Sequence, residues 1–440
     1  MRPLRWIIAL FLTLQFAIPV SAMQHDHGEM PSFKPVIIDP NKKSELQTLI
    51  NDTPAGGVLQ LEDKVYRGVI QITKPITIRG TAETQIYSLS TIFSMTDTEN
   101  VTLENVTLKA DELAVIATNV KNLKFSNVRI EEANGGIQIF NSENITFDHL
   151  TISGPGGHFS TKENAVAIYE SKQVTMTNND IWDVLDGFYL ESVKGITGSG
   201  NTITDSRYGF HMMYSDDSKL HNNTLMNNMT GLMIMIAKNV ELTDNKILRQ
   251  RSLNSLGVYL YDVENVAFRG NAMTENTTAM DIQQARALII EDNVFTTNGT
   301  VFQVKRSETA LITNNELNAN ILTVRTDHQG VQLVRNMYDD YTGDDFDKNG
   351  IGDTPHIAAN AFGQWMVKKP VYQYFMESPS VVTLNLMETD ITDTKNQLVL
   401  DAEPVVKVST RVLQLDVQPV QLAVSGAALI GLLMLRRKWK

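Results

Sequence analysis

The sequence predicts an all-β fold, a parallel β-helix whose coils of about 22 residues stack into a solenoid. Three observations lead to this prediction. Asparagines recur at a fixed interval, each interval holds two segments of alternating apolar residues, and a glycine often begins the second segment. With 440 residues, 42% of them hydrophobic, the chain is long enough to form one long repeat domain with a substantial core.

The asparagines set the period. Steps of 22 residues separate the members of three runs, namely Asn105, Asn127 and His149; Asn179, Asn201, Asn223 and Asn245; and Asn271, Asn293 and Asn315. Eight extra residues precede the second run and four precede the third, which predicts insertions around residues 154–158 and 249–254. An asparagine amide both donates and accepts hydrogen bonds, so it suits a ladder that continues from coil to coil.

Each interval contains two strand-like segments. In the first, apolar residues alternate up to the asparagine, as at Val101, Leu103 and Asn105. The second begins about eight residues after the asparagine and starts with glycine in four coils, at Gly187, Gly209, Gly231 and Gly257. We attribute these glycines to a tight corner with positive φ. A leucine-rich repeat has one strand per interval and a different asparagine phase, so the pattern favours the β-helix.

Both ends of the chain depart from the repeat. Arg2 and Arg5 precede an apolar stretch that ends in small residues at 20–22, which is typical of a secretory signal peptide. Apolar residues 422–435 are followed by basic residues, a pattern typical of a short membrane anchor, with a buried element as the alternative. The expected order is a signal peptide (1–22), a His/Met leader (23–35), the parallel β-helix (36–358), a C-terminal docking extension (359–416) and a hydrophobic tail (417–440).

Composition narrows the functions that the protein can have. The formal net charge of −12 argues against nucleic acid as a partner, because phosphate binding needs a basic face. The chain has no cysteine, so disulfides and thiolate metal sites are excluded. Soft-metal chemistry must therefore come from the 18 methionines and 8 histidines.

The register predicts which side chains of the second strand face outward. Counted from the asparagine, positions +9 and +11 are apolar in successive coils and must face the core, because side chains alternate along a strand. Positions +10 and +12 therefore face out, and in the central coils they are His211, Met213, Met233 and Met235. Coils lie about 4.8 Å apart, so these four side chains could converge on a Cu(I) ion, which imidazole and thioether ligands suit. The alternative is an apolar contact patch.

The leader offers a second candidate copper site. It contains His25, His27 and Met30. Cleavage after Ala22 would also place the new α-amine two residues from His25, and such a terminus favours copper.

A third candidate is an oxygen-rich loop near the end of the repeat. Asp345, Asp347, Asn349 and Asp353 have the alternating spacing of a calcium loop, with Gly350 at the bend. A hydrogen-bonded Asx turn that closes the solenoid explains the same residues equally well.

Catalysis is not expected. Carbohydrate-cleaving β-helices use clustered carboxylates on one outer face, whereas the outward acids Glu191 and Asp281 lie four coils apart, or about 19 Å. The protein is therefore predicted not to be an enzyme.

Three segments of the sequence carry a family resemblance: RYGFHMMYSDD at 207–217, GLMIM at 231–235, and the closing motif at 336–355. Together they resemble NosD, the periplasmic β-helix protein of nitrous oxide reductase maturation, over about residues 36–390. The resemblance implies a partner of an ABC transporter with membrane and ATPase subunits. It also implies that Cu(I) is received from the lipoprotein chaperone NosL and passed to apo nitrous oxide reductase. The family's outward His-x-Met strand corresponds to His211 and Met213, whereas the hydrophobic tail departs from the family pattern.

The expected function is thus a periplasmic accessory role in assembling the copper centres of nitrous oxide reductase, an enzyme of denitrification. The tail from residue 417 is expected to provide membrane contact. The alternative from another class is a carbohydrate-binding or carbohydrate-active β-helix, which would show solvent-facing aromatic and acidic residues along a groove.

Overall fold

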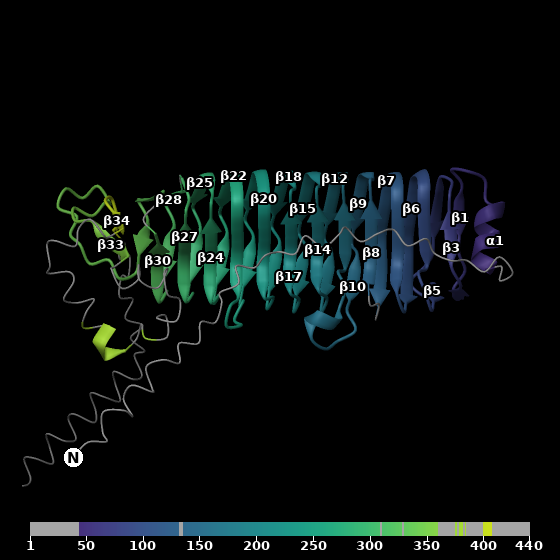
Figure 1. The fold of residues 1–440 in the computed structure, drawn as a ribbon, viewed down its shortest axis with the longest axis horizontal. Helices are drawn as coiled ribbons and strands as arrows, with labels where there is room; N and C mark the ends of the chain where they lie inside the picture. Colours follow the sequence, from purple (N-terminus) through teal and green to yellow (C-terminus); the bar gives the residue numbers. More distant parts are fainter. Residues whose placement is uncertain are drawn as a thin grey trace, which may run out of the picture. The chain divides into compact units, whose positions relative to one another are not determined.

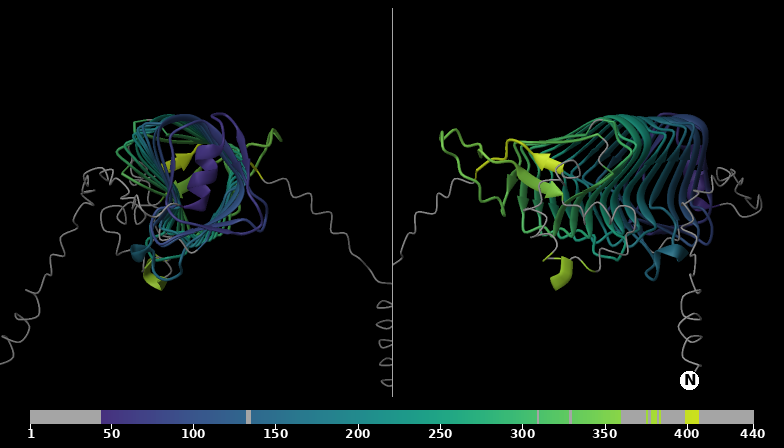
Figure 2. Two further views of the ribbon diagram at one scale, coloured as in Figure 1. Left: turned by 90° about the vertical axis from the view of Figure 1, so that its right-hand side faces the viewer. Right: turned by 60° about the vertical axis from the view of Figure 1, so that its left-hand side comes forward.

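The computed structural model describes residues 44–131, 135–308, 310–327, 330–359, 375, 378–381, 383 and 399–406. These residues form an all-β solenoid of parallel strands with coils of about 22 residues, which confirms the predicted fold (Figure 1). Helix α1 (Glu45–Asp52) lies over the N-terminal opening of the solenoid, as the end-on view in Figure 2 shows. Its Leu46 and Ile50 are buried in the hydrophobic core.

Each coil has three strands instead of the predicted two, so the solenoid has three faces. The first face comprises β3 (Ile70–Ile72), β8 (Gly135–Phe140), β11 (Val166–Tyr169), β14 (Asp186–Glu191), β17 (Tyr208–Met213), β24 (Thr278–Gln283), β27 (Thr300–Lys305) and β30 (Leu322–Thr326). The second comprises β1 (Val58–Gln60), β4 (Ile76–Arg79), β9 (Glu143–Asp148), β12 (Lys172–Thr177), β15 (Lys194–Ser199), β18 (Asp216–His221), β25 (Arg286–Glu291), β28 (Ala310–Thr313) and β31 (Val331–Val334). Four long strands turn corners and join faces: β6 (Phe93–Ala110), β7 (Leu113–Glu131), β20 (Thr230–Thr243) and β22 (Leu256–Arg269).

The third face is the one that sequence patterning missed. Its separate strands are β2 (Val65–Arg67), β5 (Gln85–Ser88), β10 (Thr151–Ser153), β13 (Asp180–Trp182), β16 (Thr202–Thr204), β19 (Thr224–Met226), β21 (Lys246–Leu248), β23 (Ala272–Thr274), β26 (Val294–Thr296), β29 (Glu316–Asn318) and β32 (Met337–Tyr338). Most have three residues with one buried in the middle, such as Ile203 in β16. A single apolar residue shows no alternation, so the pattern gave no signal.

Buried asparagines link the coils, as the repeat predicts. Asn223 is typical: its backbone N–H and side-chain Nδ2 donate to Oδ1 of Asn245, at 3.0 and 2.9 Å. Asn201 donates to Asn223 in the same way. A second buried ladder, not predicted, contains Asn276 and Asn298. These side chains pair backbone and amide groups that would otherwise be buried without partners.

The first predicted asparagine run belongs to a different position in the coil. Asn105 is half-buried and Asn127 exposed, and their φ angles are 53° and 51°. The pairing of Asp148 with Thr177 places His149 level with Asn178 (φ 54°), one residue before the buried ladder. Asparagine tolerates left-handed φ, so the same residue type suits two adjacent positions.

The first insertion is one residue shorter than the repeat predicts. Lys172 pairs with Glu143, a step of 29 residues, so the insertion adds 29 − 22 = 7 residues instead of eight.

The reason for the four strand-starting glycines also differs from the prediction. None of Gly187, Gly209, Gly231 and Gly257 has positive φ. A Cβ on Gly209 would lie 2.6 Å from the carbonyl oxygen of Gly231, and a Cβ on Gly231 would lie 2.6 Å from that of Gly257. Glycine is needed because the backbones of neighbouring coils approach closely here.

The last coil is closed by a segment that is remote in sequence. Strand β34 (Val399–Asp401) pairs antiparallel with β33 (His356–Ala359) and meets β31 at Leu333. Buried Asp401 accepts hydrogen bonds from the backbone N–H and side chain of Asn336 and from the Tyr338 hydroxyl, at 2.9, 3.1 and 3.0 Å. Residues 399–406 were expected in the docking extension, but they pack on the solenoid and end the asparagine ladder.

Replacing one ladder asparagine should destabilise the solenoid. Asn223→Ala leaves the backbone N–H and side chain of Asn201 without their acceptor, so we expect a loss of about 2–4 kcal/mol and a lower urea midpoint. Asn318→Ala is the matched control, because that half-buried side chain donates only to the Glu316 side chain among the interactions described. Equal midpoints for the two variants would contradict the ladder's stabilising role.

Candidate functional site

Two rows of outward side chains cross the middle of the first face. Register pairs Tyr189 with His211, His211 with Met233 and Met233 with Tyr259. The second row runs in parallel and contains Glu191, Met213, Met235 and Tyr261. The structure therefore brings the four predicted residues His211, Met213, Met233 and Met235 together on the adjacent strands β17 and β20.

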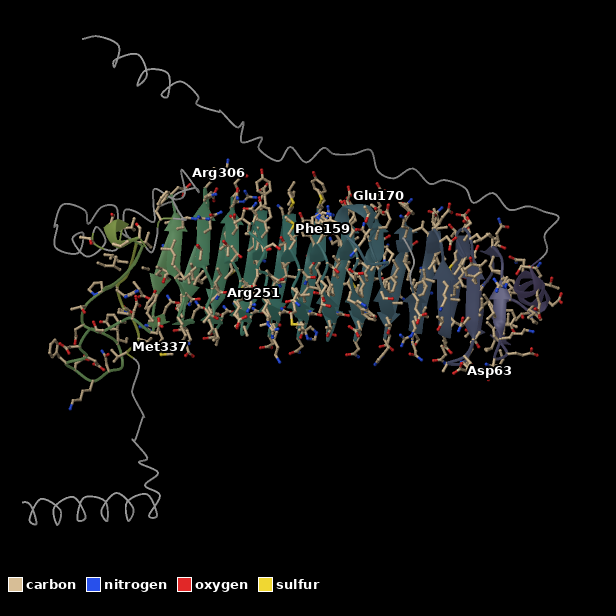
Figure 3. All side chains as sticks on the ribbon, turned by 90° about the horizontal axis from the view of Figure 1, so that it is seen from below. Asp63, Phe159, Glu170, Arg251, Arg306 and Met337 are labelled. Atoms are coloured by element: carbon tan, nitrogen blue, oxygen red, sulfur yellow. The ribbon has the colours of Figure 1, made fainter. Side chains whose placement is uncertain are left out.

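These side chains are more buried than an outer face implies. His211, Met213, Met233 and Met235 are only 5, 9, 7 and 8% exposed, although the register predicted solvent-facing positions. The three methionines form a cluster with Tyr208, with Tyr189, Tyr259 and Tyr261 packed against it. Large side chains that repeat at the coil spacing pack against each other, which alternation along a single strand does not reveal. Figure 3 shows the side chains along the whole solenoid.

His211 has an unusual hydrogen-bonding state. Its Nδ1 donates to Oδ2 of Asp186 at 2.9 Å, whereas its Nε2 is buried and has no hydrogen-bond partner among the residues that the structure describes. A carboxylate only accepts, so in the neutral ring Nε2 carries the lone pair. A buried acceptor without a donor is costly, and a metal ion is one group that would satisfy it.

Asp186 and Arg207 support this histidine, and sequence reasoning missed both. Arg207 donates to both oxygens of Asp186, at 2.8 and 2.7 Å, and Asp186 has no solvent exposure. Burial alone would raise the pKa of Asp186, but the hydrogen bonds from His211 and Arg207 outweigh it and lower that pKa. The sequence did contain one signal for Asp186. It is an acid at a position of the coil where the three following coils have the uncharged residues Tyr208, Thr230 and Leu256.

Tyrosines border the methionines on both sides. The Tyr189 hydroxyl donates to Glu191 at 2.7 Å and lies 3.8 Å from Sδ of Met213. Burial, together with Glu191, raises the pKa of Tyr189, and burial near Asp281 raises the pKa of Tyr259 to about 12. Both phenols therefore stay neutral at physiological pH, so they add no anionic ligand to the cluster.

The donor set consists of one imidazole nitrogen and three thioethers. Such neutral, soft ligands suit a monovalent soft ion better than Ca²⁺ or Mg²⁺, which require oxygen ligands. The unpartnered Nε2 of His211 fits this chemistry. The apolar packing interpretation accounts for the methionines but not for that nitrogen.

The predicted calcium loop is stabilised by its own hydrogen bonds. Asp345 accepts from the backbone N–H groups of Asn349 and Gly350 at 3.1 and 2.9 Å, and Asp353 accepts from that of Phe346 at 2.6 Å. These contacts are those of the Asx-turn alternative. Within the described residues, no group of three or more His, Asp or Glu side chains is placed to hold a metal ion.

Several predicted features lie outside the described residues. They are the signal peptide (1–22), the leader residues His25, His27 and Met30, and the tail (417–440). Among the helices that the structure does describe, none is long and apolar enough to cross a membrane.

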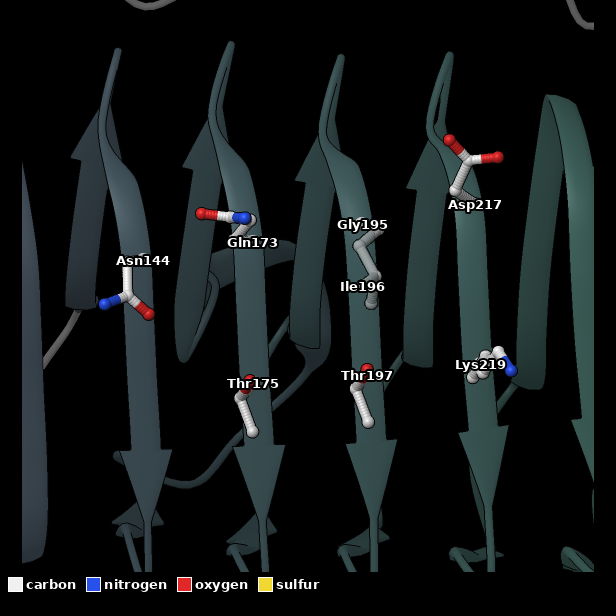
Figure 4. Close-up of a pocket in the computed structure, with 8 residues that line it drawn as sticks. All are labelled: Asn144, Gln173, Thr175, Gly195, Ile196, Thr197, Asp217 and Lys219. Atoms are coloured by element: carbon white, nitrogen blue, oxygen red, sulfur yellow. The ribbon is translucent and has the colours of Figure 1, made fainter.

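A shallow polar groove of about 520 Å³ lies on the second face (Figure 4). It is lined by Asn144, Gln173, Thr175, Gly195, Ile196, Thr197, Asp217 and Lys219. None of these is aromatic, and Asp217 is 3.4 Å from Lys194 in an exposed ion pair. The groove therefore lacks the aromatic surface that the carbohydrate alternative predicts.

Comparisons with known proteins support the predicted resemblance. The profile of the NosD family, described as periplasmic copper-binding protein (NosD), matches residues 149–343, which include β14, β17 and β20. This match confirms the resemblance to NosD over those residues. No curated protein matches the chain in sequence.

Solved structures share the β-helix fold. Tailspike protein 3 of bacteriophage CBA120 has a TM-score of 0.50 at 14% identity, covering 64% of this chain and 53% of the tailspike. The chain thus spans about half of the tailspike. A family 28 exopolygalacturonase of Yersinia enterocolitica has a TM-score of 0.44 at 9% identity, covering 65% of this chain and 75% of the enzyme. The periplasmic alginate epimerase AlgG has a TM-score of 0.38 at 12% identity, covering 64% of this chain and 84% of AlgG.

The loop contacts predict that calcium does not stabilise the protein. Because Asp345 and Asp353 already accept backbone N–H groups, adding Ca²⁺ or EGTA should leave the melting temperature unchanged. Mg²⁺ at the same ionic strength is the control. A calcium-specific rise in melting temperature that disappears in Asp345→Asn would instead support the calcium site.

Proposed function

We propose that this protein, whose central coils match the NosD family, is a periplasmic copper-binding protein that accepts Cu(I) and passes it on. The observation that supports this most directly is the buried Nε2 of His211 on the strand beside Met233, which lacks a hydrogen-bond partner within the described part of the chain. The family description gives independent support for copper. The cargo ion would be held by His211, Met213, Met233 and Met235.

The chemistry of the cluster favours Cu(I) over competing ions. Its ligands are neutral, and the buried carboxylate that contacts His211, Asp186, is already offset by Arg207. Zn²⁺ and Cu²⁺ gain from anionic or additional nitrogen ligands, whereas thioethers suit Cu(I). Surrounding tyrosines keep the cluster mostly shielded from water, which helps to protect a bound Cu(I) from oxidation.

The proposed context is assembly of the copper centres of nitrous oxide reductase. In this proposal, the solenoid receives Cu(I) from the lipoprotein NosL and passes it to the apo enzyme. An ABC transporter with membrane and ATPase subunits would be its partner complex. The resemblance to NosD at residues 207–217 and 231–235 is the basis for these partners.

A paired substitution tests the copper site. His211→Ala with Met233→Leu removes the imidazole and one thioether while keeping most of the buried volume, so the tight Cu(I) site should disappear. The measurement is an anaerobic titration of the mature chain against a chromophoric Cu(I) chelator. His221→Ala with Met226→Leu is the matched control, because these half-buried residues lie on the other two faces. An unchanged tight site in the first variant would overturn the proposal.

The leader and the tail are tested separately. Replacing His25, His27 and Met30 with alanine should remove a second Cu(I) equivalent if the leader binds copper, which the same titration measures.

We also propose that the tail from residue 417 holds the protein at the inner membrane. The protein should then stay with membranes after osmotic shock and be released by detergent. Full release without detergent would contradict the anchor.

A further inference from the structure

The environment of His211 is built around one carboxylate. Asp186 accepts two hydrogen bonds from Arg207 and one from Nδ1 of His211, all within 2.9 Å. Arg207 and His211 both belong to the next coil, where Arg207 immediately precedes β17 and His211 lies within it. The guanidinium offsets the charge of the buried carboxylate, so the imidazole is not required as its counter-ion.

Two tyrosines also restrict the imidazole ring. The rings of Tyr189 and Tyr208 stand perpendicular to it, with centroid distances of 4.8 and 5.1 Å and interplanar angles of 88° and 87°. The ring therefore has one nitrogen fixed by Asp186 and two aromatic neighbours that limit its rotation. Nε2, the other ring nitrogen, has no hydrogen-bond partner in the described ranges of the chain.

We propose that Asp186 and Arg207 are positioning residues that keep the proton of His211 on Nδ1, so that Nε2 remains a free ligand beside Met233. This inference rests on the proposed copper function and deepens it. Neither residue would contact the metal. Carboxylates commonly orient metal-binding histidines in this way, and their loss typically weakens metal affinity roughly 10- to 100-fold.

The shared oxygen Oδ2 makes removal of the whole carboxylate the informative change. Oδ2 accepts from both Arg207 and Nδ1 of His211, so an asparagine whose carbonyl oxygen took that place would leave the proton of His211 on Nδ1. Asp186→Leu with Arg207→Leu instead removes the acceptor and its counter-ion together. The proton of the neutral ring is then no longer held on Nδ1, so the tautomer with Nε2–H, which has no lone pair on Nε2 for copper, becomes populated.

The experiment measures the tautomer and the affinity separately. In the metal-free mature chain, ¹⁵N NMR of labelled histidines reports which nitrogen of His211 is protonated, with His211→Ala assigning the signal. We expect Nδ1–H in the original protein and a population with Nε2–H in Asp186→Leu with Arg207→Leu, together with Cu(I) affinity reduced roughly 10- to 100-fold in the competition titration. Asp217→Asn, which changes an exposed ion pair with Lys194, is the control and should alter neither value.

The outcomes separate this inference from the proposed function. If His211→Ala with Met233→Leu loses the site while Asp186→Leu with Arg207→Leu binds normally, positioning by Asp186 is wrong but the copper function stands. If neither variant changes binding, both are overturned. Should this double variant fail to fold, Asp186→Val with Arg207→Met removes the same two charges with different packing. That variant should show the same loss of affinity, and unchanged affinity would overturn the inference.

Discussion

The hydrogen bond from each buried asparagine to the next is the interaction on which the solenoid depends. It satisfies backbone and side-chain groups that cannot reach water, and it recurs from Asn179 to Asn336. Because each bond joins equivalent positions of neighbouring coils, it fixes their register. A slip by one residue would turn the outward side chains toward the core. The ladder therefore also determines which side chains can meet outside the solenoid.

The candidate copper site is a consequence of that register. His211 and Met213 come from one coil and Met233 and Met235 from the next, so no single segment contains the cluster. The fold supplies rigid strands for these residues, and the preceding coil supplies Asp186 behind the imidazole. A site with ligands on two coils and a supporting carboxylate on a third depends on the stacking of all three.

The sequence predicted the solenoid, its period and the four clustered residues, because these follow from local repetition and strict alternation along strands. It did not predict the third strand of each coil, since strands such as β16 contribute a single apolar residue. It also misjudged exposure at Met233 and Met235, because their burial depends on the packing of side chains from several coils. Asp401 and Asn336 are 65 residues apart in the sequence, so the repeat pattern could not predict their contact.

Asp401 gives the asparagine ladder a defined end. The ladder is directional: each asparagine donates to the coil that follows, so the bonds could continue through any further coil or through another molecule stacked at that end. Asp401 receives the donors of Asn336, and as a carboxylate it has none of its own to pass on. Its other oxygen accepts from the backbone N–H groups of Arg335 and Glu403. A solenoid that could in principle polymerise along its axis is thus ended by a carboxylate, Asp401, at the place where the next asparagine amide of the ladder would stand.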